Sequence, residues 1–219
     1  MDLRFKHPFT MMVSGCTSSG KSVWTFNLVK NMYELVSPIP DHVIWCYSEY
    51  QPLYEQIEKI PYVTMHEGLP DLETLTQTKN KPKLLVLDDL CGTDSKKNAE
   101  ITTVFVRKSH HANCSAICLV NNLFLSNMRT SRLNCHYMVL MRSLQDRSQI
   151  MTLGRQIFPE NPRFLQNAFK KATLNPYSYL MIDLEQNTLE DYCLRSKIFP
   201  GEITEVYVPE SKPISYIPI

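Results

Sequence analysis

Short runs of apolar residues alternate with longer segments of mixed polarity along most of the chain. Apolar runs of about four to eight residues are typical of buried strands, and longer amphipathic segments are typical of helices. Strands are expected at residues 9–14, 42–47, 62–66, 83–87, 115–120 and 137–141, with 62–66 at an edge. Helices are expected at residues 21–35, 98–110, 145–157 and 162–172, with shorter ones through Tyr54 and Ile57 and from Asp71. This alternation predicts an α/β fold in which helices flank a mostly parallel sheet.

The pattern changes near residue 175. Residues 177–184 and 192–197 alternate apolar and polar positions around the segment EQNTLED, which predicts an antiparallel hairpin. The segment YVPESKPISYIPI carries three of the 14 prolines and is expected to be extended. We therefore divide the chain into a main unit at residues 1–175 and a hairpin with its tail at residues 176–219, packed on that unit or extending from it.

Composition and charge narrow the class of protein. The 219 residues are 43% hydrophobic and 21% charged, which is ordinary for a globular domain. The net charge is +1, so binding to nucleic acid requires a local basic surface or a ring of several subunits. The longest apolar runs, such as residues 116–120, are far shorter than the ~20 residues of a membrane helix, and no signal peptide is recognisable. We therefore expect an intracellular protein without a membrane partner.

Seven cysteines, an odd number without a CxxC pair, are typical of a reducing compartment. One cluster raises the alternative of a zinc site: His110, His111, Cys114, Cys118, Cys135 and His136. Its spacing matches no zinc pattern, and Cys114 and Cys118 fall in a predicted strand, where cysteine commonly packs as a small core residue. The core interpretation is therefore favoured over zinc.

The segment GCTSSGKS at residues 15–22 satisfies the pattern GxxxxGK[ST] of a phosphate-binding loop. A predicted strand precedes it and a predicted helix follows, so backbone N–H groups and the positive end of the helix dipole can surround phosphate oxygens. Lys21 is expected to contact the outer phosphates, and the Ser22 hydroxyl is expected to bind Mg²⁺. The predicted nucleotide-binding residues are Gly15, Cys16, Thr17, Ser18, Ser19, Gly20, Lys21, Ser22 and Val23.

Two acidic residues end a second predicted strand, in the segment KLLVLDDL. Asp88 is expected to hold Mg²⁺ through its water shell. Asp89 is then placed to orient or deprotonate a water molecule. Adjacent carboxylates beside an apolar strand are unfavourable unless a cation neutralises them, which favours a metal site over a purely structural one.

Asn121 and Asn122 follow the predicted strand at residues 115–120. Asn121 is a candidate for contacting the outer phosphate and the attacking water. The alternative is a turn that ends the strand, in which asparagine is common. The residues alone favour neither interpretation.

Three classes of protein use such a loop, and each needs further features in its sequence. A small-molecule kinase needs an acceptor pocket and usually a lid that carries arginine, and a GTPase needs a guanine-reading motif of the NKxD kind, which is not present. A motor ATPase needs an acid beside the magnesium ligand, a sensor on the next strand and an arginine from a neighbouring subunit. The pairs DD and NN and the segment RTSR occur in that order, which favours a motor.

Longer segments resemble the DNA-packaging ATPases of Polinton (Maverick) elements and adintoviruses, which belong to the FtsK–HerA superfamily and are related to the poxvirus packaging ATPase. The likeness extends over nearly the whole chain and is most specific in SEYQPLY, SHHAN and LGRQ. Other matching segments are PFTMMVSGCTSSGKS, KLLVLDDL, RTSRLNCHYMVLMRS and NPYSYLMIDLEQ.

Two positions depart from the family pattern. The family more often has Gln-Asn at the sensor where this chain has Asn121 and Asn122, and the shorter Asn121 leaves its reach to phosphate or water open. Superfamily relatives usually carry glutamate at the position of Asp89, so Glu49 in SEYQPLY is a second candidate base. We favour Asp89 because it adjoins the expected metal ligand.

The resemblance implies a RecA-like P-loop ATPase that works as a homo-oligomeric ring, with a hexamer expected, around double-stranded DNA. Hydrolysis of ATP with Mg²⁺ would drive DNA into a preformed capsid through a capsid or portal vertex, in the host nucleus, at a cytoplasmic assembly site or associated with the virion. The finger arginine that the resemblance favours is Arg129, with Arg147 as the reserve.

Small basic loops are the DNA contacts that we expect in such a motor, because the chain has no basic domain. They are Lys96 with Lys97 and the segment KNKPK at residues 79–83, for which ordinary solvated surface charge is the alternative. The alternative function for the whole chain is a nucleotide-dependent DNA-binding or regulatory module without sustained translocation.

Overall fold

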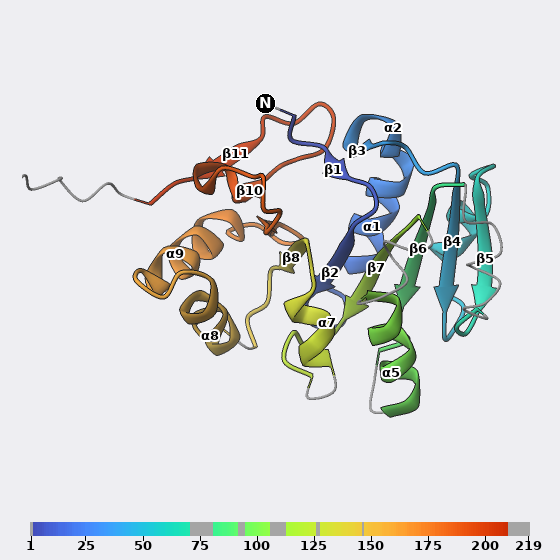
Figure 1. Ribbon diagram of the computed structural model, residues 1–219, viewed down its shortest axis with the longest axis horizontal. Helices are drawn as coiled ribbons and strands as arrows, with labels where there is room; N and C mark the ends of the chain where they lie inside the picture. The colour runs from blue at the N-terminus through green and yellow to red at the C-terminus, as the bar shows by residue number, and fades with distance from the viewer. Residues whose placement is uncertain are drawn as a thin grey trace, which may run out of the picture.

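The computed structural model describes residues 2–70, 81–91, 95–105, 113–125, 128–145 and 147–209, with the side chains of 95–97 excepted. Within these residues, one nine-stranded sheet forms the centre of the molecule. The strand order is β11-β10-β9-β8-β2-β7-β6-β4-β5 (Figure 1). The strands are β2 (Thr10–Ser14), β4 (His42–Tyr47), β5 (Val63–Glu67), β6 (Lys83–Asp88), β7 (Cys114–Val120), β8 (Tyr137–Met141), β9 (Tyr179–Asp183), β10 (Leu194–Ser196) and β11 (Glu205–Tyr207).

The strands from β8 to β5 are parallel, which confirms the predicted sheet and places β5 at its edge. Every residue of β2, β6, β7 and β8 is buried, because helices cover both faces. Successive residues of each strand therefore contribute to two separate cores. In β6, for example, Leu84 and Val86 pack in one core and Leu85 and Leu87 in the other.

Helices on the two faces complete three layers. One core contains apolar residues of α1 (Lys21–Lys30), α2 (Met32–Leu35) and α3 (Tyr54–Ile57). The other contains residues of α5 (Ser95–Thr103), α8 (Ser148–Ile157) and α9 (Pro162–Ala172). The short helix α7 (Arg129–Leu133) lies beside α5 (Figure 1), where the Thr102 and Ser131 hydroxyls are hydrogen-bonded at 2.9 Å.

The predicted C-terminal hairpin is confirmed, and it extends the main sheet. β9 runs antiparallel to β8 and β10 runs antiparallel to β9. A short 3₁₀ helix (Glu190–Tyr192) lies in their connection, and β11 pairs with β10 as a further antiparallel strand. The proline-containing tail from residue 210 and the short helix expected from Asp71 lie outside the described residues.

Several predicted boundaries differ from the structure; α5, for example, begins at Ser95 instead of residue 98. The helix expected at residues 21–35 is divided at Asn31 into α1 and α2, and α8 begins at Ser148 instead of residue 145. A small parallel pair, β1 (Phe5–Lys6) with β3 (Val36–Ser37), was not predicted. Strands of two residues are too short to show any periodicity, so only the folded chain reveals them.

A buried ion pair ties the hairpin to the N-terminal segment. Arg195 in β10 is 1% exposed, and its guanidinium donates to Asp183 Oδ2 in β9 and to the Leu3 carbonyl. Asp183 Oδ1 also accepts from the Thr188 hydroxyl at 3.0 Å and the Glu185 N–H at 3.1 Å. Each charge therefore has its partner in the interior, where leaving either one unpaired would be unfavourable, although the buried Arg195 Nε has no hydrogen-bond partner among the described residues.

Replacing Asp183 with alanine should destabilise the fold strongly, because it leaves the Arg195 charge buried without its partner. The expected loss in the free energy of unfolding is about 3–5 kcal/mol, measured by chemical denaturation. The matched control is Lys197→Ala, which breaks the exposed pair between Lys197 and Glu205 and should change little. Equal effects of the two substitutions would contradict this account of the hairpin.

Candidate nucleotide site at the carboxyl edge of the sheet

The predicted phosphate loop connects the end of β2 to the start of α1. The Gly15 N–H donates to the Val120 carbonyl at 3.2 Å, and the Ser19 N–H donates to the Cys16 carbonyl at 3.1 Å. Gly20 caps α1 with φ of 96°, a backbone conformation that favours glycine. A Cβ atom on Gly15 would lie 2.5 Å from Ser19 Oγ and 2.6 Å from Met141 Cβ, so packing requires a glycine at residue 15 as the backbone conformation does at residue 20.

Lys21 is folded back over its own loop. Its ammonium donates to the Gly15 carbonyl at 2.8 Å, the Cys16 carbonyl at 3.1 Å and Asn121 Oδ1 at 2.8 Å. Burial lowers the Lys21 pKa, and the nearby carboxylates of Asp89 and Asp88 oppose that shift. Asn121 therefore contacts the phosphate-loop lysine directly, from the end of the neighbouring strand β7.

Asp88 is the last residue of β6 and is 3% exposed. The Tyr54 hydroxyl donates to its Oδ2 at 3.0 Å. Burial raises the Asp88 pKa, hydrogen bonds from Ser22 and Tyr54 oppose the shift, and the adjacent Asp89 adds to it. The two predicted metal ligands, Ser22 and Asp88, are thus brought together, and their oxygen atoms are the type that Mg²⁺ prefers.

Asp89 and Glu49 differ in how they lie relative to the site. Asp89 adopts φ of 58°, is exposed, and lines the same cavity as Lys21 and Asp88. Glu49 is exposed after β4 and is not among the residues that line that cavity. The arrangement therefore favours Asp89 over Glu49 as the group beside a reacting phosphate.

Lys21, Asp88 and Asp89 line one cavity of about 490 Å³, which we call the phosphate cavity. Its lining consists of residues 17–23, 51–53, Asp88, Asp89, Asn121 and Tyr177. Ser19 Oγ is buried and has no hydrogen-bond partner within the described part of the chain. A buried unsatisfied hydroxyl and a loop of N–H groups fit a phosphate ligand, and the carboxylate of Asp88 fits the cation that accompanies it.

The sequence reasoning missed two residues of this site. Tyr54 holds Asp88, and Tyr177 reaches the phosphate loop from the turn before β9. Both lie in segments that carry the family resemblance, SEYQPLY and NPYSYLMIDLEQ, but the tyrosines themselves gave no signal of a role, because tyrosine beside an apolar segment is ordinary core composition. Asn122 takes part in the turn that ends β7, the alternative to a role at the phosphates. Its Oδ1 accepts from the Phe124 N–H at 2.7 Å and so stabilises that turn.

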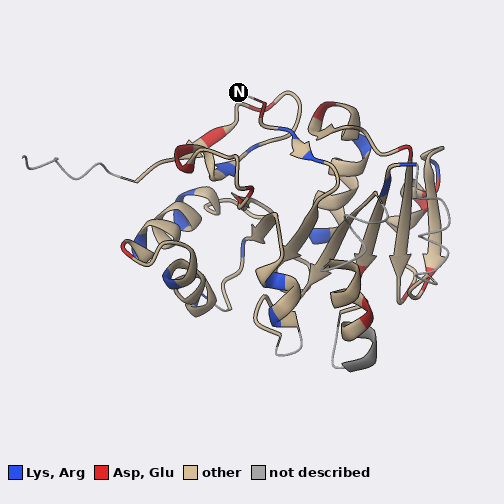
Figure 2. Ribbon diagram, in the orientation of Figure 1, with Lys and Arg blue, Asp and Glu red and all other residues tan. Residues whose placement is uncertain are grey.

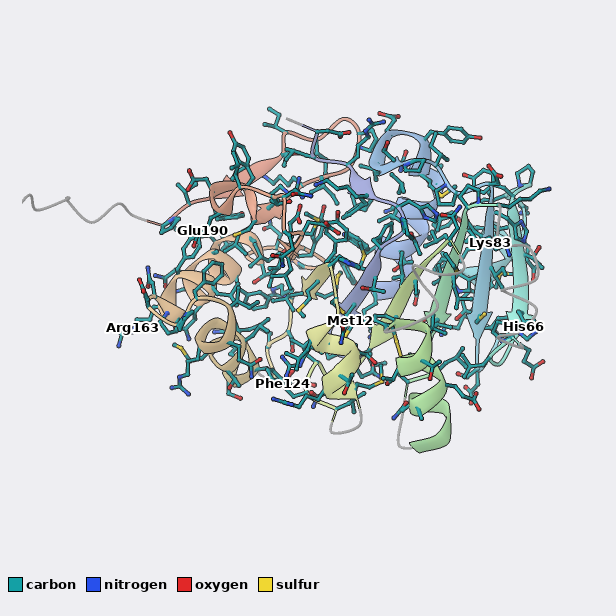
Figure 3. The ribbon with its side chains drawn as sticks, viewed as in Figure 1. Met12, His66, Lys83, Phe124, Arg163 and Glu190 are labelled. Atoms are coloured by element: carbon teal, nitrogen blue, oxygen red, sulfur yellow. A yellow bond between two sulfur atoms is a disulfide. The ribbon has the colours of Figure 1, made fainter. Side chains whose placement is uncertain are left out.

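The segment RTSR, which contains the favoured finger Arg129, belongs to a short helix. Residues 129–133 form α7, with Arg129 exposed. Arg132 is buried: its Nη1 donates to Gln156 Oε1 at 2.6 Å and its guanidinium lies 4.5 Å from the centroid of Phe124 (labelled in Figure 3). Arg147 is exposed at the N-cap of α8. Neither Arg129 nor Arg147 lines the phosphate cavity of its own chain.

The predicted DNA contacts are placed only in part. The backbone of Lys96 and Lys97 belongs to α5, and their side chains lie outside the described residues. The segment KNKPK does not form one basic loop, because Lys83 (labelled in Figure 3) is buried as the first residue of β6. Basic residues also occur along α8 and α9, coloured blue in Figure 2: Arg155, Arg163, Lys170 and Lys171.

The cysteine content is typical of a reducing compartment, in which all thiols would be free, but the structure contains one disulfide. Cys91 and Cys118 form a disulfide, and the other five cysteines are free. Cys91 follows β6 and Cys118 lies in the adjacent β7, a proximity that their separation in sequence does not reveal. Burial raises the pKa of the Cys114 thiol to about 12, as suits a core residue.

His110 and His111 of the considered zinc cluster lie outside the described residues, and the described ones contain no group of three metal-ligating side chains. Within the same residues, no helix combines the length and apolar character needed to cross a bilayer.

Replacing Asp88 with asparagine should leave the ligand-free protein at least as stable as wild type, because it removes a buried carboxylate while an amide oxygen can still accept from Tyr54. It should also abolish stabilisation by Mg²⁺ with a non-hydrolysable ATP analogue, which for wild type is about 2.7 kcal/mol at 100 times the Kd. Thermal unfolding with and without ligand measures both effects. Asp41→Asn, at an exposed position, is the matched control. A ligand-induced shift of wild-type size in Asp88→Asn would contradict the assignment.

No family model and no curated protein matches the sequence. The cytoplasmic domain of the Thermomonospora curvata Type VII secretion ATPase EccC has a similar structure, with a TM-score of 0.57 and 13% identity over 82% of this chain and 24% of that chain.

ATPases 2 and 3 of EssC from Geobacillus thermodenitrificans match with a TM-score of 0.54 and 11% identity over 95% of this chain and 41% of that chain. The genome packaging NTPase B204 from Sulfolobus turreted icosahedral virus 2, in complex with AMPPCP, has a TM-score of 0.49 and 13% identity over 93% of this chain and 99% of that chain. This chain therefore spans less than half of the EccC and EssC chains. The EccC and EssC likenesses show the fold, a mostly parallel sheet flanked by helices of the RecA-like P-loop type. The FtsK–HerA, Polinton and adintovirus assignments stay predictions.

Proposed function

We propose that this protein is an ATP-hydrolysing motor that translocates double-stranded DNA into a viral or virus-like capsid. The observation that carries the ATPase part is the pair of opposite buried charges at one cavity. Burial shifts the pKa of Lys21 down and that of Asp88 up, so each side chain is pushed toward its neutral form. An anion beside Lys21 together with a divalent cation beside Asp88 reverses both penalties, and a magnesium nucleotide supplies both.

The roles of the side chains follow from their positions. Lys21, released from the Gly15 and Cys16 carbonyls, would bind the outer phosphates, while Ser22 and Asp88 would hold Mg²⁺. The cation neutralises phosphate charge as it develops. Asp89 would orient the attacking water, because it lines the cavity next to Asp88 without a hydrogen bond that restrains it in the described structure. Asn121 would report the state of the phosphates through its contact with Lys21.

The lining of the phosphate cavity supports a ring of subunits, because no arginine of the described residues belongs to that lining. The arginine side chains of Arg129 and Arg147 are exposed and do not line the cavity of their own chain. An arginine from the neighbouring subunit would supply the missing positive charge for the transition state. We favour Arg129 because of the family resemblance, with Arg147 as the reserve, and Arg132 in the same helix as Arg129 is already held by Gln156 and Phe124. A hexamer is the size that the family resemblance implies.

Double-stranded DNA and a capsid or portal vertex are the proposed partners, and the support for both is the resemblance of SEYQPLY, SHHAN and LGRQ to packaging ATPases. Lys96 and Lys97 remain the proposed DNA contacts. The proposed site of action is the host nucleus or a cytoplasmic assembly site, with association to the virion as a further location.

The purified protein should hydrolyse ATP with Mg²⁺, and double-stranded DNA should raise the rate. Lys21→Ala should lower both ATP affinity and turnover, because Lys21 binds the outer phosphates. Phosphate release measured with and without DNA tests this, with the exposed Lys30→Ala in the same helix as the control. Nucleotide binding without DNA-stimulated turnover would instead indicate a regulatory module.

The same assay separates the two candidate bases. Asp89→Asn should lower turnover about 10²- to 10⁴-fold and change ATP affinity little, because Asp89 acts on water. Glu49→Gln, at an exposed position outside the cavity, should retain most activity. The opposite pattern would reassign the base to Glu49.

Mixing two inactive variants tests the arginine from the neighbouring subunit. Arg129→Ala should lower turnover by about 10³- to 10⁵-fold, as loss of an arginine finger does. Rings that contain both Arg129→Ala and Lys21→Ala subunits have some interfaces with an intact lysine on one side and an intact arginine on the other, so activity should return. Absence of recovery in mixtures shown to co-assemble would exclude Arg129 as a finger acting across the interface, and Arg147→Ala would then take its place in the same test.

A further inference from the structure

A second cavity adjoins the phosphate cavity at the start of α1. It has a volume of about 360 Å³, and we call it the aromatic cavity. Gly20, Val23 and Tyr177 line both cavities, so the two meet at these residues. The remaining lining residues of the aromatic cavity are Trp24, Asn27, Tyr179, Phe199 and Glu202.

The character of the lining changes from one cavity to the other. The phosphate cavity contains the charged residues Lys21, Asp88 and Asp89. The aromatic cavity is backed by three packed rings: Trp24 lies 5.5 Å from Tyr179 and 5.6 Å from Phe199, measured between ring centroids. A nucleotide changes in the same order along its length, from a charged phosphate chain to a flat aromatic base.

Tyr177 stands at the junction in an unusual conformation. Its φ is 60°, which is rare for a bulky residue, and the residue is 71% exposed. The turn is held in place, because the Ser178 N–H donates to the Asn175 carbonyl at 3.3 Å and the Ser178 carbonyl accepts from the Arg142 N–H at 2.9 Å. The ring lies against Gly20, with Cδ1 3.3 Å from where a Cβ on that glycine would be. Strained, exposed aromatic residues of this kind are typical of ligand contacts.

We propose that the aromatic cavity binds the adenine base of the nucleotide, with Tyr177 stacking on the base and Asn27 reading its polar edge. This inference rests on the proposed function, which places the phosphates of the nucleotide in the phosphate cavity. It assigns specificity to residues that lie outside the phosphate loop, and it gives the turn before β9 a direct part in substrate binding.

The polar groups of the aromatic cavity suit an adenine edge. The half-buried Asn27 carries an amide with both a donor and an acceptor, which is the pairing that adenine N6 and N7 require. Glu202 Oε2 accepts from the Phe199 N–H at 3.1 Å, which leaves Oε1 to accept from the amino group of the base. Stacking on tyrosine tolerates any base, so Tyr177 supplies affinity and Asn27 supplies preference.

Calorimetric titration with Mg²⁺ and three probes tests the proposal: non-hydrolysable analogues of ATP and GTP, and inorganic tripolyphosphate, which has no base. Tyr177→Ala should weaken binding of both nucleotide analogues roughly 5- to 150-fold, the range for loss of one stacked base, and leave tripolyphosphate unchanged. Tyr177→Phe should bind as wild type does. Asn27→Leu should reduce the preference for the ATP analogue over the GTP analogue. Tyr33→Ala, at an exposed tyrosine that lines neither cavity, is the control.

The possible outcomes separate this proposal from the proposed function. Equal weakening of tripolyphosphate and nucleotide by Tyr177→Ala would show that the ring only supports the phosphate loop, which overturns the base site. Unchanged nucleotide binding in Tyr177→Ala, or equal wild-type affinity for the two nucleotide analogues, would also overturn it. Failure of folded wild-type protein to bind either nucleotide or tripolyphosphate would overturn the proposed function, and the base site with it.

Discussion

The parallel alignment of β6, β7, β2 and β8 is the constraint on which the rest of the site depends. Their register is continuous, with Ser14 opposite both Val120 and Leu140, so the chain leaves all of them at one edge of the sheet. The phosphate loop, Asp88 and Asn121 therefore meet although about a hundred residues separate the first from the last. Cores on both faces hold the strands in this register, because a shift by one residue would exchange the residues that face each core.

Electrostatics at that edge make the site specific for a particular kind of ligand. Lys21 is held by two carbonyls and an amide, and Asp88 by a tyrosine hydroxyl, so neutral dipoles satisfy both charges. Such partners compensate only part of the desolvation of a buried charge. A ligand that carries negative charge and a divalent cation together improves the environment of both residues. In the proposed base site, the turn with Tyr177 would extend the same site from phosphate binding to recognition of the rest of the nucleotide.

The sequence predicts the fold well where the apolar runs are long. The ranges of β4, β8 and α9 agree with those expected, and the phosphate loop is recognised from residues 15–22 alone. The sequence does not predict features that depend on contacts between distant residues. These are the pairing of β1 with β3, the hydrogen bond from Tyr54 to Asp88, and the position of Tyr177 beside Gly20. Arg132 shows the same limit, since its burial against Gln156 follows from how α7 packs and not from the segment RTSR.

Amide hydrogen exchange on the wild-type protein, with and without Mg²⁺ and a non-hydrolysable ATP analogue, tests the central claim most directly. The account predicts slower exchange on ligand binding at the phosphate loop, residues 15–23, and around Asp88, because both segments then contact one ligand. Exchange in the cavity between α9 and β11, lined by residues such as Arg163 and Val206, should stay unchanged. Protection at that distant cavity, with none at residues 15–23, would contradict the account.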